Sequence, residues 1–209
     1  GGDFIGEGNM PNINNAQGIA ALEVMKSLTA YMDPEYLVSD STYVQQQFQQ
    51  GKIAMANLWA SRAGAMNDAA ESQVVGKVKM SAAPMGSAAP ASSLWWDGIV
   101  IAANITDEEA EAAFKLVMEG LKPEVIAANN DAAVWLVDGF TAGPLAAGAA
   151  ATAAAGARPY PASGPMGIMH TVLGNGIADY LNGAKDAATA LADIEAAYIT
   201  AAKEAGLVK

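Results

Sequence analysis

The segment Ser93–Ala103, with the sequence S-L-W-W-D-G-I-V-I-A-A, sets the strongest limit on how this chain can fold. Its second half, Ile99–Ala103, is a short continuous apolar run. Such a run predicts a buried strand, although a buried helical segment has the same pattern. Gly98 precedes the run and permits a backbone geometry that other residues resist. The segment therefore predicts a buried element that begins after a glycine of unusual backbone geometry.

Trp95, Trp96 and Asp97 carry the chemistry of this segment. Indole rings can cover the apolar C–H face of a pyranose, and a carboxylate accepts hydrogen bonds from sugar hydroxyls. The alternative is structural, with one tryptophan in the core and the other filling a gap at the surface. The segment alone favours neither interpretation.

The charge balance narrows the class of partner. Twenty-two acidic residues against 11 basic ones give a net charge of −11 and a sequence pI near 4.3. Nucleic acid and anionic membranes carry the same sign, so neither is an expected partner. The absence of cysteine excludes disulfides and thiolate metal ligands, and it is compatible with a bacterial periplasm. No run of roughly 18 apolar residues predicts a transmembrane helix.

Capping residues predict where helices begin. Thr106 and Glu109 have the spacing of a capping box, in which the hydroxyl accepts a backbone N–H and the carboxylate reaches back. A buried stripe is expected on the helix that follows, formed by Ala110, Ala113, Phe114, Val117, Met118 and Leu121. Further helices are expected from Asn14 or Asn15, from Asp40, Ser41 or Thr42, within Ser61–Ser72, from Pro144, through Val172–Leu181 and from Asp186.

Two more segments are predicted to be strands. Ile53–Leu58 is a compact apolar run that ends at Trp59, with Arg62 close behind, and Val74–Ala82 alternates weakly. Ligands of open α/β sheets bind at strand ends, so Trp59 and Arg62 are candidate ligand contacts. The structural alternative is a core tryptophan and a solvated arginine. Helices outnumber strands in this order, which predicts a helix-rich α/β fold.

The segment before the last two helices contains several prolines. Arg158–Pro161 must be extended, because each proline fixes its own φ and restrains the residue before it. The sequence Gly164-Pro165 and then Gly167 is expected to continue an irregular path as far as His170. Asn182-Gly183 is expected to end the next helix, and Gly206 the last one, after which Leu207 and Val208 fold back.

Signatures of bond-breaking chemistry are absent. No G-x-S-x-G elbow, H-E-x-x-H pattern, EF-hand loop or phosphate-cradling glycine loop occurs, so no metal or cofactor is expected. The acidic run Asp107–Glu109 is better explained as the charged start of a helix than as a catalytic cluster. A lone His170 is more often structural than catalytic. Aromatic and polar side chains at element ends suit binding.

Several motifs together carry a family resemblance. They are F-x-x-G-K-I-A-M from Phe48 with Trp59 soon after, D-G-I-V-I from Asp97 leading into E-A-x-x-A-F from Glu109, and L-N-G from Leu181 before Ala187–Leu191. In order and spacing the chain resembles the C-terminal half of an extracellular solute-binding protein of a sugar ABC transporter, in the group that includes maltose-binding protein.

The resemblance implies a periplasmic-binding-protein-like (type II) fold. Residues 1–97 would form the first part of the C-terminal lobe, residues 98–144 an excursion into the N-terminal lobe, and residues 145–209 the closing helices. The first lobe's opening segments would be missing. The resemblance implies a sugar or polyol between the lobes, contacted by Trp59, Arg62, Trp95, Trp96, Asp97, Gly98, Tyr160 and His170.

The implied setting is delivery of that ligand to the permease subunits of an ABC importer. The protein would be periplasmic or extracellular, with a membrane anchor in the missing N-terminal part as an option. His170 departs from the family pattern, which has an aromatic residue near this position.

Two other hypotheses stay open at this stage. The first is an α/β enzyme acting on a carbohydrate, with Asp97 and His170 as an acid–base pair. The second is an inert structural domain whose alanine-rich helices simply pack. The favoured prediction is that the chain is a binding protein for transport and not an enzyme.

Overall fold

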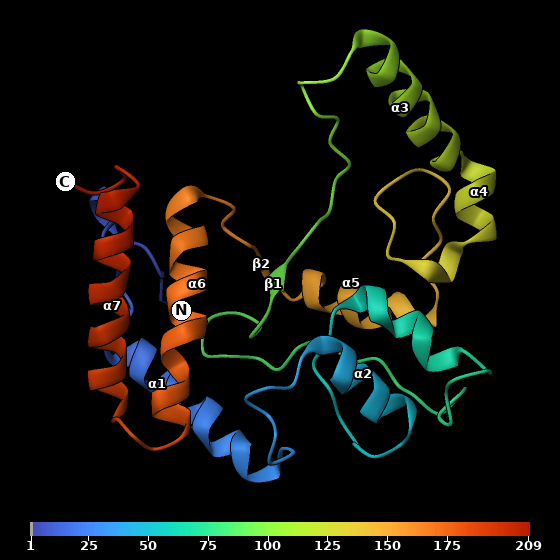
Figure 1. Ribbon diagram of the computed structural model, residues 1–209. Coiled ribbons are helices and arrows are strands. Elements are labelled where there is room, and N and C mark those ends of the chain that lie inside the picture. The colour runs from blue at the N-terminus through green and yellow to red at the C-terminus, as the bar shows by residue number, and fades with distance from the viewer. Residues whose placement is uncertain (1) are drawn as a thin grey trace. The chain divides into compact units, whose positions relative to one another are not determined.

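A computed structural model describes residues 2–209, which form two compact units. Unit 1 combines the N-terminal residues up to Ser39 with Tyr160–Lys209, and unit 2 is Asp40–Pro159. The lobe boundaries predicted from the sequence divide the chain differently, and that assignment stays a prediction. Figure 1 shows the helices α1 (Ala16–Leu28), α2 (Ser41–Gln49), α3 (Asp107–Gly120), α4 (Pro123–Ala128), α5 (Ala147–Ala154), α6 (Gly164–Leu181) and α7 (Ala187–Glu204).

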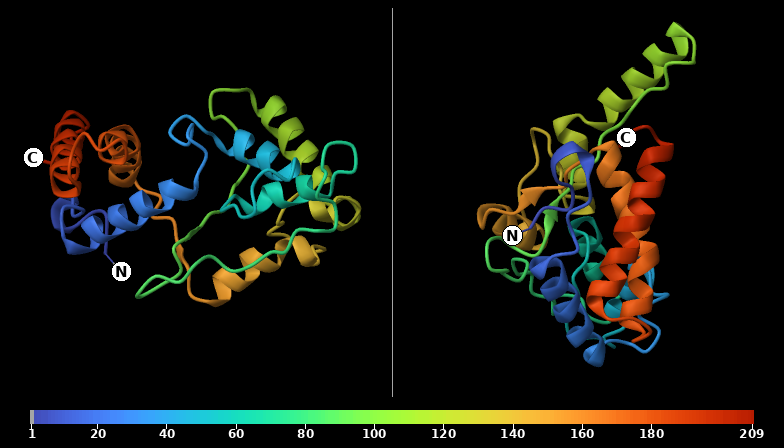
Figure 2. Two further views of the ribbon diagram at one scale, coloured as in Figure 1. Left: turned by 90° about the horizontal axis from the view of Figure 1, so that it is seen from below. Right: turned by 90° about the vertical axis from the view of Figure 1, so that its left-hand side faces the viewer.

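Unit 1 is built around α6 and α7, which lie side by side and are joined by a short connection (Figures 1 and 2). α1 packs against α7. Gly176 lets the two long helices approach closely, because a Cβ at this position would collide with the Ile194 side chain. The core that results consists of Ile13, Leu22, Met166, Met169, Ala187, Leu191, Ile194, Tyr198 and Ala202.

Two side chains of α7 fasten the N-terminal loop of unit 1. One carboxylate oxygen of Glu195, Oε1, accepts the backbone N–H groups of Ile13 and Asn14, each at 2.8 Å. The Tyr198 hydroxyl donates to the Asn9 carbonyl at 2.7 Å, and burial raises the pKa of this hydroxyl. These bonds join segments more than 180 residues apart in the sequence, so unit 1 depends on tertiary contacts.

The predicted helix starts are confirmed by their caps. Asn15 accepts from Gln17 and Gly18, and Asp40 accepts from Tyr43. Thr106 and Glu109 form the full capping box, which lowers the pKa of the Glu109 carboxyl. The predicted helix ends are confirmed as well, because Gly51, Gly183 and Gly206 have positive φ. The Leu207 N–H donates to the Ala202 carbonyl at 2.8 Å, so the chain folds back after the last helix.

Acid is expected to weaken unit 1 partly through the cap of α7. The Asp186 carboxylate accepts the Thr189 N–H at 2.8 Å, and this bond lowers the pKa of Asp186. A group with a lowered folded pKa stabilises the fold above its unfolded pKa, near 3.9, and loses that contribution as the pH falls through the folded value. Asp186→Asn keeps a good cap but cannot titrate.

The expected result is a smaller loss of stability below about pH 4 in Asp186→Asn than in the wild type. Urea midpoints measured by circular dichroism at pH 7 and at several acidic pH values would show it. Parallel pH curves for the two proteins would contradict a role for this carboxylate.

Unit 2 contains short helices connected by long loops. Its 3₁₀ segments are η3 (Ala60–Asn67), η4 (Asn130–Ala132) and η5 (Pro144–Ala146), and unit 1 adds η1 (Glu7–Asn9) and η2 (Thr29–Tyr31). η3 and η4 approach so closely that a Cβ on Gly64 would lie 2.5 Å from the Asp131 carbonyl oxygen. Ala63 and Met66 of η3 are buried. The helix predicted at Ser61–Ser72 is therefore present as a shorter 3₁₀ segment.

Three strand predictions are wrong for the described residues. Ile53–Leu58, Val74–Ala82 and Ile99–Ala103 have no strand structure, and Val100 is 91% exposed. In residues 2–209 the named strands are β1 (Ser93–Leu94) and β2 (Arg158–Pro159), which pair in parallel. A strand needs a neighbour to satisfy its backbone groups, and none of the described residues forms a strand beside these three segments.

Two helix predictions also need correction. No residue of α3 is buried, and on its expected buried stripe Phe114 and Met118 are 56% and 50% exposed. Gly164-Pro165 is not irregular, because α6 begins at Gly164 with Ser163 as its cap. Proline lacks the N–H that the first turn of a helix leaves unused, so it is tolerated there.

Candidate ligand site

Two tryptophans predicted to bind ligand contact each other in unit 2. Trp59 lies at the start of η3 and Trp95 directly follows β1. Their ring centroids are 5.4 Å apart and the ring planes meet at 88°, an edge-to-face contact. Trp59 is 51% exposed and Trp95 45%, so half of this aromatic surface is open to solvent. The structural alternative for Trp59, a core position, is wrong.

The residues after Trp95 are more exposed. Trp96 is 72% exposed, and the Asp97 carboxylate is also open to solvent. Gly98 does not have the positive φ that would require glycine. Its position instead leaves room for the Trp96 ring, because a Cβ on Gly98 would lie 3.2 Å from ring atom Cζ3. The expectation of an unusual backbone geometry at Gly98 is therefore wrong, and the constraint is steric.

Arg62 points to α2. Its Nη1 donates to Gln45 Oε1 at 2.7 Å, and its Nη2 lies 3.5 Å from Thr42 Oγ1. The guanidinium is thus held by neighbouring side chains, and the alternative of a freely solvated arginine is wrong. The backbone N–H of Arg62 also donates to the Trp59 carbonyl at 2.9 Å, which closes the first turn of η3.

Tyr160 and His170 form a second pair, in unit 1. The Tyr160 hydroxyl lies 3.1 Å from His170 Nδ1, and the two rings are edge-to-face with centroids 6.0 Å apart. His170 is exposed at the surface of α6. The structure therefore brings the predicted residues together in two places, one in each unit.

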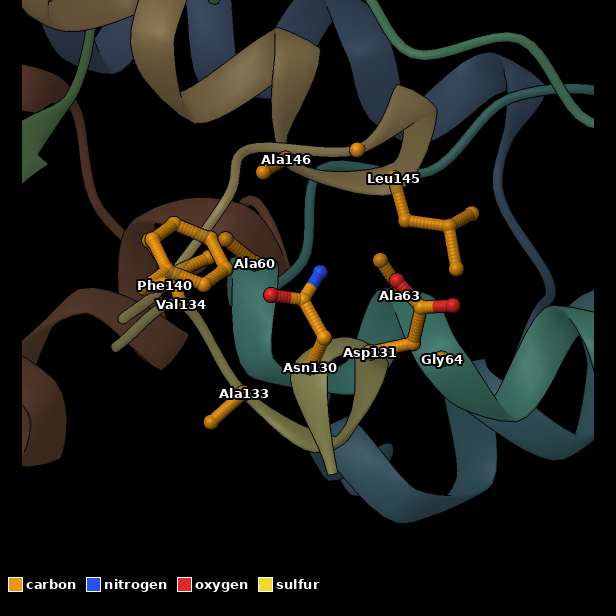
Figure 3. A pocket seen from close by; sticks show the side chains of 11 residues that line it. Ala60, Ala63, Gly64, Asn130, Asp131, Ala133, Val134, Phe140, Leu145 and Ala146 are labelled. Carbon is orange, nitrogen blue, oxygen red and sulfur yellow. The ribbon is translucent and has the colours of Figure 1, made fainter. Parts of the chain in front are cut away.

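The cavities of unit 2 involve residues that sequence reasoning did not single out. A cavity of about 10 Å³, roughly the space of one water, lies between η3, η4 and η5. Figure 3 shows the side chains that line it. The Asn130 amide on its wall bonds both backbone groups of Thr141, at 2.8 and 3.0 Å. An adjoining open hollow of about 410 Å³ is lined by Ser61, Gly64, Ala65, Asn67, Asp68, Asp131, Ala132 and Leu145. No sequence motif marks the residues that line this hollow.

Residues 2–209 contain neither a candidate metal cluster nor a candidate membrane helix. No cluster of three or more histidine, aspartate or glutamate side chains in this range could hold a metal ion. None of the helices in the same range is long and apolar enough to cross a membrane.

Six chains of solved structures are similar to this one, and two of them are named by their ligands. An ABC transporter solute-binding protein from Agrobacterium radiobacter K84, solved in complex with ribitol, is 26% identical with a TM-score of 0.75. The match covers 93% of this chain and 52% of that one. Maltose-bound MalE3 of T. maritima is 20% identical with a TM-score of 0.77, over 95% of this chain and 54% of that one.

These matches show the type II periplasmic-binding-protein fold predicted from the sequence, and the chain spans about half the length of the solved structures. Comparison with curated proteins gave no match. A family model described as bacterial extracellular solute-binding protein matches residues 2–159. The family and the structural neighbours are transport binding proteins. A periplasmic or extracellular location follows from the family. The chain therefore belongs to the bacterial extracellular solute-binding protein family.

Proposed function

We propose that this chain is part of the substrate-binding component of an ABC importer and binds a sugar or polyol. The observation that carries the proposal is the exposed edge-to-face pair of Trp59 and Trp95 in a chain of this family. Indole faces match the C–H faces of sugars and polyols, and they bind without a charge on the ligand. Two structural neighbours were solved with ribitol and with maltose, which supports this ligand class.

The roles of the site residues follow from their chemistry. Trp59, Trp95 and Trp96 supply stacking surface, and the Asp97 carboxylate accepts hydrogen bonds from ligand hydroxyls. Gly98 leaves room for the Trp96 ring. Tyr160 and His170 supply a hydroxyl and an imidazole that both donate and accept.

The proposed partners are the permease subunits and a further lobe. The lobe is supported by the half-length coverage of the solved structures and by uncovered apolar surface. Phe114, Leu116 and Met118 on α3 are each at least 50% exposed, as are Ile99 and Val100. Large apolar side chains left this exposed are expected to be covered, and the proposed lobe would cover them. A membrane anchor that keeps the protein beside the permease is part of the same proposal.

The test is a tryptophan-fluorescence titration with monosaccharides, disaccharides and polyols. It is run on this chain and on a longer chain that carries the proposed lobe. Saturable quenching or a blue shift is expected in the longer chain, because ligand binding removes water from the exposed rings. No response to any of these ligands in either form would reject the ligand class. Turnover of a carbohydrate would instead point to the enzyme alternative.

A further inference from the structure

The orientation of Trp59 depends on η3, and two side chains of α2 hold η3. Gln45 and Gln49 are four residues apart, so they lie on one face of α2. Gln45 Oε1 accepts from Arg62 Nη1 at 2.7 Å. Gln49 Nε2 donates to the Ala65 carbonyl at 2.9 Å. The two bonds join the same helix face to η3 at Arg62 and at Ala65.

Gln49 is notable because its side chain is buried. It is 3% exposed, whereas buried polar side chains are costly unless their hydrogen bonds are made. Its Nε2 donates a hydrogen bond to the Ala65 carbonyl, and its Oε1 lies 3.4 Å from Gln45 Nε2. The two glutamines are therefore linked to each other as well as to η3. A linked pair of this kind allows few alternative positions of η3.

We propose that Gln45 and Gln49 are positioning residues for ligand binding, acting through Arg62 and Ala65 to hold η3 and thereby Trp59 against Trp95. Neither glutamine needs to touch the ligand. The guanidinium of Arg62 serves the same purpose, because Gln45 and Thr42 engage it. The link to the site is short: the Arg62 N–H donates to the Trp59 carbonyl at 2.9 Å. This inference rests on the proposed function, while the ring contact on which it acts is measurable without ligand.

The first readout is the ring contact itself. Coupled indole transitions of two tryptophans in contact give paired bands in the far-UV circular dichroism spectrum, and Trp95→Phe identifies the pair by removing it. Gln45→Met and Gln49→Met keep side-chain length and remove the amide. Both are expected to weaken the paired bands of the 209-residue chain. Gln46→Met is the matched control, because Gln46 is exposed on the same helix.

The second readout is affinity, measured by the fluorescence titration in the longer chain. Each Met variant is expected to bind roughly three- to tenfold more weakly, the range for loss of one hydrogen bond. Gln45→Glu is expected to restore part of the loss seen in Gln45→Met, because a carboxylate also accepts from Arg62 but cannot donate to Gln49 Oε1. If the glutamines had only a structural role, Gln45→Met and Gln49→Met would both lower stability. Gln45→Glu would then not regain affinity relative to Gln45→Met.

The outcomes separate the two proposals. Unchanged paired bands in both Met variants would overturn the positioning role, whether or not ligand binds. Weakened bands with unchanged affinity would also overturn it. Weakened bands in a protein that binds no sugar or polyol would support the hold on Trp59 and reject the proposed ligand class.

Discussion

Replacing Tyr198 with alanine is expected to lower the free energy of unfolding of unit 1 by about 3–5 kcal/mol, the usual cost of deleting a buried aromatic ring. The Tyr198 side chain is 0% exposed and lies in the core between α1, α6 and α7. Its hydroxyl also holds the Asn9 carbonyl at 2.7 Å, so the substitution frees the N-terminal loop. A loss of this size is a large fraction of the stability of an ordinary domain.

The positions of the tryptophans allow unfolding of unit 1 to be distinguished from unfolding of unit 2. Trp59, Trp95, Trp96 and Trp135 all lie in unit 2, so their fluorescence reports on unit 2. Helical circular dichroism reports on both units, and α6 and α7 with 18 residues each contribute much of it. In urea, Tyr198→Ala is expected to shift the circular dichroism transition to lower urea far more than the fluorescence transition.

Two variants serve as controls for Tyr198→Ala. Tyr198→Phe keeps the ring and loses the hydroxyl, so it is expected to cost about 1 kcal/mol. Tyr31→Ala removes a tyrosine of the same unit that is 90% exposed, and its effect is expected to stay within about 0.5 kcal/mol. Equal effects of Tyr198→Ala and Tyr31→Ala would show that the core does not depend on this ring.

Replacing Trp59 with alanine is expected to weaken sugar or polyol binding by about 10- to 100-fold, the range for truncating an aromatic residue central to a binding site. The ring is half exposed and lies edge-to-face on Trp95. Alanine would remove this stacking surface together with its contact to the Trp95 ring. The loss of folding stability in Trp59→Ala is expected to be smaller than in Tyr198→Ala, because about half of the Trp59 ring is already in water.

The titration in the longer chain tests this expectation. Trp59→Phe retains an aromatic face and is expected to bind more tightly than Trp59→Ala. Trp135→Phe removes a different tryptophan of unit 2, whose Nε1 donates to the Asn129 carbonyl at 3.0 Å, and is expected to leave affinity near the wild-type value. Unchanged affinity in Trp59→Ala would reject Trp59 as a ligand contact without rejecting the ligand class.

The candidate site could be predicted only in part. The sequence placed Trp59, Trp95 and Trp96 at the ends of apolar runs, and the contact between two of them is a tertiary fact. Arg62 was expected to face a ligand or water, and the structure engages it with α2. Gln45 and Gln49 carried no signal in the sequence, because their importance lies in the distant segment that they contact.

Helix boundaries were determined by the sequence itself. The caps at Asn15, Asp40, Thr106 and Asp186 act within three residues of themselves, so a local pattern suffices to identify them. The strands could not be settled in this way. Ile53–Leu58 and Ile99–Ala103 have apolar patterns typical of strands, yet a strand exists only where another strand accepts its hydrogen bonds. Only the tertiary structure decided which segments pair as strands, because strand pairing depends on residues far away in the chain.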